Sequence, residues 1–150
     1  MLKDYTLENL TADCLEAEID IKDAAAKVEQ WDAKKWALFE YSNRDVSLID
    51  DIDELDIEDE EINFNGEDLL ILDENEADDR WEQELDYYIE ECIYPELPEH
   101  LQNYFDEAAW KRDARFDGRG HAISRYDGVE NEFCIKFDDD SQEYINIYRM

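Results

Sequence analysis

The carboxylates of Asp and Glu are the side chains in this sequence that could do the most chemistry. There are 45 Asp and Glu against 14 Lys and Arg, which gives a formal net charge of −31. The acids are segregated: from Asp45 to Trp110 the only Lys or Arg is Arg80, and roughly half of the residues from Asp50 to Glu91 are acidic. Carboxylates at this density can serve as acid–base catalysts, as cation ligands or as a fixed array of negative charge.

Catalysis is the least supported of these three uses. The sequence has no P-loop, GxSxG, HExxH or GxGxxG motif. His100 and His121 are the only histidines. In so acidic a chain a carboxylate lies near any histidine by chance, so such a neighbour does not indicate catalysis. We expect both histidines at the surface or at helix ends. Residues 118–121 are too short to cradle a phosphate and predict a turn. A hydrolase with a paired carboxylate remains a formal alternative, since any two acids can lie close together in this composition.

Specific cation binding is also poorly supported. A calcium-binding EF-hand loop needs acids at positions 1, 3 and 5, Gly at position 6 and Glu at position 12. The segments 51–56 and 73–78 both fail at the fifth position and lack the glycine. Residues 138–140 form at most a weak cation site. We therefore expect no catalytic residue, no metal ligand and no cofactor.

The remaining composition indicates a folded cytoplasmic protein. Four Trp, nine Tyr and six Phe argue against a disordered acidic chain. The length predicts one acidic domain over residues 1–150, which could divide into 1–75 and 76–150. Three widely spaced cysteines without a CxxC pair indicate reduced thiols. No signal peptide or membrane span is expected from the apolar runs.

A polyanion of this kind selects its partners by charge. It repels nucleic acids and anionic membranes but attracts a basic protein surface. A helix with two exposed acids per turn carries a charge about every 2.7 Å, close to the spacing of about 3.4 Å along one DNA strand. Ordered acids could thus occupy the basic groove of a DNA-binding enzyme. The acids expected to replace phosphates are Asp50, Asp51, Asp53, Glu54, Asp56, Glu58, Asp59, Glu60, Glu61, Asp78, Asp79, Glu82, Asp86, Glu90 and Glu91.

Two other uses of the charge compete with this hypothesis. A halophilic coat would be spread over the whole chain, whereas this charge is concentrated in the middle. A helix face that only interacts with solvent would carry both acidic and basic residues and would be stabilised by ion pairs between residues four positions apart. Here Lys and Arg are almost absent over some sixty-five positions. The segregation therefore favours a functional surface.

The first half of the chain is predicted to begin with helices. Apolar residues recur at helical spacing in 7–15 and again in 24–31. Residues 36–41 are predicted to form a strand, and 49–57 either a short helix or an irregular acidic loop. An Asn65-Gly66 pair between apolar runs indicates a hairpin with a type I′ turn.

The second half is predicted to combine acidic helices with strands. The clearest helix runs from 77 to 94, a second runs from about 98 to 112, and Pro95 and Pro98 separate them. The apolar stripe of the first helix consists of Trp81, Leu85, Tyr88, Ile89 and Cys92. Its acids Asp79, Glu82, Asp86 and Glu90 are expected along one flank.

Three strands are expected at the C-terminal end, at 122–126, 132–137 and 144–148, with turns at 127–128 and 138–141. The fold class predicted from these elements is α+β, in which acidic helices pack with a C-terminal three-stranded antiparallel meander.

The segment 96–113 resembles a stretch of ArdA-type antirestriction proteins. The residues that carry the resemblance are Pro98, Leu101, Gln102, Asn103, Tyr104, Asp106, Arg112 and Asp113. The preceding acidic helix, with Tyr87, Tyr88, Ile89 and Glu90, is similar in character. The resemblance covers about a quarter of the chain, from 77 to 113, and does not extend to residues 1–60.

The resemblance implies a protein of phages or mobile elements that protects incoming DNA from type I restriction-modification enzymes. Members of that family act as elongated acidic dimers that imitate bent DNA, so a homodimer is implied here too. Leu101, Tyr104 and Phe105 would then pack in the core, and Arg112 would form an ion pair.

The expected function is therefore inhibition of a host restriction-modification enzyme by occupation of its DNA-binding groove. An anti-CRISPR or other counter-defence inhibitor with the same acidic surface is the nearest alternative. An acidic chaperone that buffers many basic proteins is a third.

Overall fold

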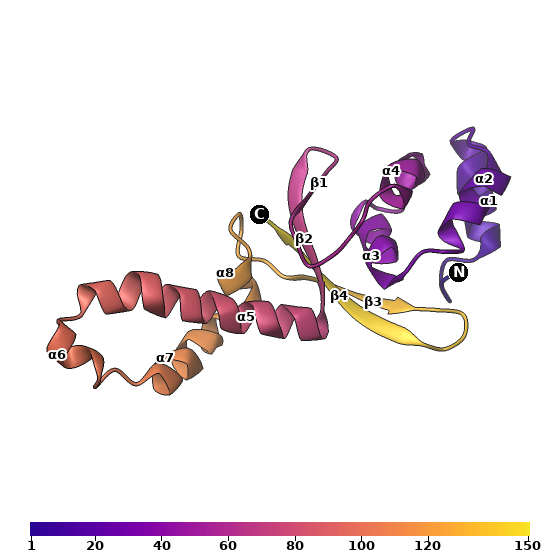
Figure 1. The fold of residues 1–150 in the computed structure, drawn as a ribbon. Coiled ribbons are helices and arrows are strands. Elements are labelled where there is room, and N and C mark those ends of the chain that lie inside the picture. Colours follow the sequence, from indigo (N-terminus) through magenta and orange to yellow (C-terminus); the bar gives the residue numbers. More distant parts are fainter.

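The computed structural model describes residues 1–150 and has an α+β architecture. A four-stranded antiparallel sheet with the order β1-β2-β4-β3 lies at its centre. The strands are β1 (Ile62–Phe64), β2 (Glu67–Asp73), β3 (Asn131–Lys136) and β4 (Gln142–Arg149). Figure 1 shows helices α1–α4 on one side of the sheet and the long helix α5 leading away from it in the other direction, so that the molecule is elongated.

The N-terminal helices cover the sheet with the main hydrophobic core. They are α1 (Leu7–Glu16), α2 (Ile21–Val28), α3 (Ala33–Tyr41), η1 (Val46–Leu48) and α4 (Ile49–Asp53). Asp20 and Asp32 start α2 and α3 by accepting hydrogen bonds from backbone N–H groups of the first turn. The rings of Trp31, Trp36 and Phe39 meet edge to face, with centroids 5.2–5.9 Å apart, inside this core.

The strand predicted at residues 36–41 is wrong, because these residues belong to helix α3. Asp32 caps this helix through the backbone N–H of Lys35. Trp36, Ala37, Leu38 and Phe39 are all buried. A helix buried on every side shows no polar face, so its apolar run has the same pattern as a buried strand.

The predicted hairpin is confirmed at Asn65 and Gly66, which both have positive φ angles of 49° and 81°. These angles suit a type I′ turn, and Ile62 pairs with Leu69 across the hairpin. Leu69 and Ile71 of β2 then join the main core, whereas Leu70 and Leu72 belong to a second cluster on the other face of the sheet. Strand β2 is thus buried on both faces.

The segment from Glu74 to Ile123, called the arm below, leaves the sheet and returns to it. It comprises α5 (Glu74–Tyr88), a π-helical turn η2 (Ile89–Ile93), η3 (Tyr94–Glu96), α6 (Glu99–Gln102), α7 (Glu107–Ala114), η4 (Arg115–Asp117) and α8 (Arg119–Ile123). Figure 1 places α6 at the far tip, with α7 and α8 leading back to the sheet. The long helix predicted over 77–94 is confirmed in part: α5 begins earlier, at Glu74, and ends at Tyr88, after which the π-helical turn η2 continues to Ile93.

The helix predicted over 98–112 is interrupted, because α6 ends at Gln102 and Asp106 caps a new helix through the backbone N–H of Ala109. Tyr104 is 84% exposed and Leu101 is 42% exposed, so the prediction that they lie in the core is wrong. The ion pair predicted for Arg112 is a long one of 3.9 Å to its neighbour Asp113.

The predicted three-stranded meander is also corrected. Residues 122–126 form no strand, because Ala122 and Ile123 end helix α8 and Ser124 Oγ donates a hydrogen bond to the carbonyl of Arg149. Strands β3 and β4 form as expected, but β4 pairs on its other side with β2. In the predicted meander β3 would be the central strand, whereas in the structure β3 is an edge strand and the doubly buried β2 lies beside β4 at the centre of the sheet.

Candidate partner-binding surface

Part of the acidic charge of α5 is neutralised within the arm. Lys111 of α7 lies 2.5 Å from both Glu82 and Asp86, and Arg115 also pairs with Glu82. The Lys111 side chain is 14% exposed, and its hydrogen bonds to Asp86 and Glu82 raise its pKa. Two of the four acids expected along one flank of α5 therefore form ion pairs that hold α7, although their side chains stay 45% and 49% exposed.

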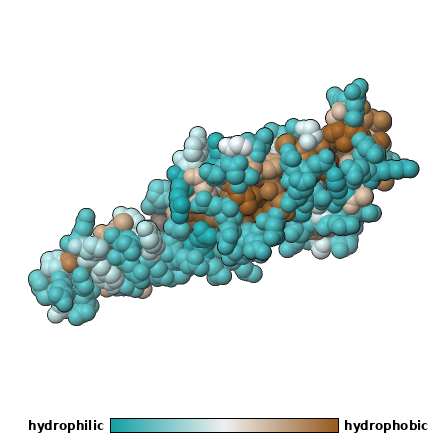
Figure 2. All heavy atoms as spheres, turned by 45° about the horizontal axis from the view of Figure 1, so that its top comes forward, coloured by the Kyte–Doolittle hydropathy of each residue, from teal (hydrophilic) through white to brown (hydrophobic).

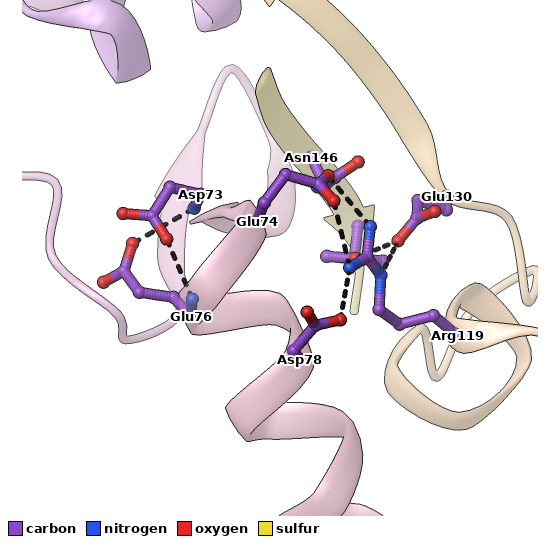
Figure 3. Close-up of polar contacts among 8 residues, drawn as sticks. Asp73, Glu74, Glu76, Asp78, Arg119, Glu130 and Asn146 are labelled. Atoms are coloured by element: carbon purple, nitrogen blue, oxygen red, sulfur yellow. Dashed lines mark hydrogen bonds and ion pairs between the residues drawn. The ribbon is translucent and has the colours of Figure 1, made fainter. Parts of the chain in front are cut away.

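A second set of acids surrounds Arg119, whose side chain is 10% exposed (Figure 3). Its guanidinium pairs with Glu74 at 3.0 Å, with Asp78 at 2.8 Å and with Glu130 at 2.5 Å. Asn146 of β4 also donates a hydrogen bond of 2.7 Å to Glu74. This group, called the Arg119 cluster below, joins the first turns of α5 to α8 and to the sheet.

The charged groups of the Arg119 cluster neutralise one another and so hold α5, α8 and the sheet together. The hydrogen bonds from Asn146 and Arg119 lower the pKa of Glu74. Burial raises the pKa of Tyr148, whose hydroxyl donates to Glu130. Each charged group already has a partner of opposite sign, so no carboxylate here is poised as a free acid or base. The cluster fixes the direction in which α5 leaves the sheet.

Figure 3 also shows how α5 begins. Asp73 accepts a hydrogen bond of 2.8 Å from the backbone N–H of Glu76, and the Glu76 carboxylate accepts one of 3.1 Å from the backbone N–H of Asp73. This reciprocal capping box uses two further acids to fix the helix start. Glu76 also pairs with Lys34 at 2.8 Å.

The densest group of acids without internal partners is the acidic segment, residues 54–60, between α4 and β1. Leu55 and Ile57 pack against the main core, while Asp56 and Glu58 are exposed. Alternate residues therefore face inward and outward. Arg80 of α5 donates a hydrogen bond of 2.9 Å to the backbone carbonyl of Asp59, which ties the segment to the arm without neutralising a carboxylate.

The expected acids therefore divide into two groups. Asp50 pairs with Lys27, Glu61 lies 3.3 Å from Arg125, and Asp53 accepts a hydrogen bond of 2.9 Å from the indole of Trp31. With Asp78, Glu82 and Asp86, these acids have partners within the chain. The expected acids whose side chains have no such partner are Asp51, Glu54, Asp56, Glu58, Asp59, Glu60, Asp79, Glu90 and Glu91, all exposed.

On α5 and its π-helical extension the free acids are sparser than the sequence suggested. Asp79 and Glu90 are eleven positions apart, or about 16 Å at about 1.5 Å per residue. Only Glu84, which is half-buried, lies between them without an ion pair. That spacing is wider than the phosphate spacing of about 3.4 Å along a DNA strand. The acidic segment is thus the main candidate for a phosphate-like array.

Lys111 and Arg119 are the residues whose part in the site, the neutralisation of acids of α5, was not predicted from the sequence. Their positions after Trp110 restore charge balance along the chain, but their partners lie 29 and 45 residues away, at Glu82 and Glu74. Ion pairs between residues so far apart in the sequence cannot be predicted from the spacing of residues within one helix or strand.

Other kinds of site find little support in the structure. No group of three or more His, Cys, Asp or Glu side chains is arranged to hold a metal ion. Cys14, Cys92 and Cys134 are free thiols. None of the helices has both the length and the apolar character needed to cross a bilayer. Figure 2 shows mainly hydrophilic side chains over the arm, and hydrophobic ones gathered over the sheet and the N-terminal helices.

Comparison of the chain with protein-family models, with curated proteins and with solved structures found no match.

Proposed function

We propose that the protein is a DNA mimic that inhibits a host DNA-binding enzyme of the restriction-modification class by occupying its basic groove. The observation that carries this proposal is the acidic segment, in which five of the seven residues from Glu54 to Glu60 are exposed acids without an internal cation. Leu55 and Ile57 anchor them to the core. The backbone that carries these acids is therefore held against the core, and Arg80 also holds the carbonyl of Asp59.

The internal ion pairs support the same proposal. Lys111, Arg115 and Arg119 neutralise Glu82, Asp86 and Asp78 of α5. The acids of the segment 54–60 keep their charge and are exposed. An enzyme that grips DNA through Lys and Arg gains affinity by releasing counterions from phosphate, and a fixed row of carboxylates offers the same gain without a base contact.

The choice of target rests on the resemblance of residues 96–113 to ArdA-type proteins, which favours a type I restriction enzyme. A CRISPR enzyme has a basic groove of the same general chemistry. A cytoplasmic location in the host follows from either target.

The test is capture followed by competition. The full-length tagged chain is incubated with a lysate of bacteria that express a type I restriction enzyme, and the retained proteins are identified. The purified target is then mixed with labelled duplex DNA and increasing amounts of the chain. We expect DNA to be displaced in proportion to the chain added, and displacement to weaken steeply between about 50 mM and about 200 mM salt.

A complex that contains target, DNA and chain together would contradict the proposal. Capture of a CRISPR effector in place of a restriction enzyme would support the proposal that the chain mimics DNA, but it would contradict the proposed class of target. Retention of many basic proteins without a defined stoichiometry would instead indicate a charge-buffering protein.

A further inference from the structure

A cavity of about 380 Å³ lies between α5 and the returning elements α7, η4 and α8. Aromatic side chains form much of its wall. Tyr88 and Trp110 are stacked, with centroids 5.3 Å apart and an interplanar angle of 9°. Tyr87 and Tyr88 nevertheless remain 62% and 50% exposed. The cavity, called the aromatic pocket below, therefore presents ring surface that nothing in the chain covers.

Two carboxylates, those of Glu84 and Asp117, also line the aromatic pocket. Neither has an ion pair or a hydrogen bond from another side chain, and no Lys or Arg lines the cavity. The nearby cations Lys111 and Arg115 are held by Glu82 and Asp86. His121 also lines the cavity but forms no ion pair with either carboxylate. The pocket thus combines aromatic surface with two carboxylates that have no ion-pair partner.

This combination fits a cation that carries an apolar stem. Aromatic faces attract cations, and the attraction is stronger where water is displaced. A guanidinium fits better than an ammonium, because it is planar, less strongly hydrated and able to stack on a ring while it donates to a carboxylate. The volume lies within the range of about 300–1,000 Å³ found for pockets that bury a small group.

We propose that the aromatic pocket receives an arginine side chain of the protein partner. That the arginine belongs to an enzyme with a DNA-binding groove rests on the function proposed above, since such grooves are lined by Arg and Lys. The acidic segment would supply long-range attraction. The pocket would supply a buried arginine anchor of the kind that dominates many protein interfaces.

The experiment measures binding of three blocked tripeptides, Gly-Arg-Gly, Gly-Lys-Gly and Gly-citrulline-Gly, by NMR titration of the full-length chain. We expect the arginine peptide to shift the Trp110 indole and to bind at least about fivefold more tightly than the lysine peptide, which has the same charge. The citrulline peptide, which has a similar shape but no charge, should produce no shift.

Three variants localise the site. The double variant Glu84→Gln with Asp117→Asn, and the single variant Tyr87→Ala, should each weaken binding of the arginine peptide about fivefold or more. Glu143→Gln removes an exposed acid from β4 and should leave binding unchanged. Equal binding of the arginine and lysine peptides, or equal binding by the double variant and Glu143→Gln, would overturn the proposal.

The same variants separate the pocket from the proposed function. If the arginine peptide fails to bind while the chain still displaces DNA from the target, the proposal of an arginine pocket is refuted and the proposed function is not. If the peptide binds as expected but the chain displaces no DNA from the target, the arginine pocket is supported and the proposed DNA mimicry is refuted.

Discussion

Arg119 shows how a single basic residue can organise a strongly acidic chain. Its side chain is 10% exposed and satisfies three carboxylates from two parts of the sequence. Removing one partner from a buried pair costs about 3–5 kcal/mol, because a charge is left unpaired. The cost here is smaller, since the side chains of Glu74 and Asp78 are 43% and 64% exposed and water can solvate them.

We therefore expect Arg119→Ala to lower the free energy of unfolding by about 2–3 kcal/mol. The matched control is Arg112→Ala, which removes a side chain that is 72% exposed and should change stability by less than about 0.5 kcal/mol. Urea denaturation monitored by tryptophan fluorescence measures both variants. Equal stability of the two variants would show that the Arg119 cluster does not anchor the arm.

The pKa of Glu74 gives the cluster a pH dependence with a definite sign. Hydrogen bonds from Asn146 and Arg119 hold the folded-state pKa of Glu74 below its ordinary value. The stability from Glu74 is therefore complete above the unfolded pKa of about 4.3, and it is lost as the pH falls through the lower folded value. We expect Tm to fall as the pH is lowered below about 4.3, and to fall less steeply in Glu74→Gln. An identical slope in the variant would assign acid unfolding to other groups.

At the scale of elements, the alternation in the acidic segment matters more than the number of its acids. Leu55 and Ile57 are half-buried against the core, and the acids between and beside them are exposed. Ordering one residue of a flexible chain costs about 1–2 kcal/mol. A segment already held in place does not incur this cost when it binds.

The double variant Leu55→Ala with Ile57→Ala tests this point, because it changes no charge. We expect it to raise hydrogen exchange in residues 54–61 and to weaken displacement of DNA from the target about tenfold, since about 1.4 kcal/mol corresponds to a factor of ten. The control Ile19→Ala with Ile21→Ala also truncates two half-buried residues of the same core. A similar loss in both variants would mean that global stability, not the order of the segment, governs the interaction.

The elements differ in how far local pattern could predict them. Helix α5 and the hairpin at Asn65-Gly66 follow from periodicity and turn chemistry, and both were predicted. Helix α3 was not, because burial on all sides removes the polar face that separates a helix from a strand. The β2–β4 pairing joins residues more than seventy positions apart, and no short-range pattern carries that information.

At the scale of the whole molecule, acidic residues have two roles in the elongated structure of Figure 1: some form ion pairs within the chain and others are exposed without a partner. Paired acids of α5 hold α7 and α8 through Lys111 and Arg119, and the acids of the segment 54–60 are exposed without a partner. The segregation of charge could be seen in the sequence. The division into paired and unpaired acids could not, because it depends on which distant basic residues fold back onto α5.

The most direct test of the account compares two chains of equal net charge. One has six acids replaced by amides at Glu54, Asp56, Glu58, Asp59, Glu60 and Asp79, and the control has Gln in place of Glu8, Glu16, Glu18, Glu29, Glu132 and Glu143, all exposed. The concentration of chain that displaces half of the duplex DNA from the target enzyme is measured for both. We predict an increase of about tenfold or more for the first chain and less than about threefold for the control, since positioned charges dominate close-range complementarity. Equal increases, or no increase in the first chain, would contradict the claim that ordered acids stand in for phosphates.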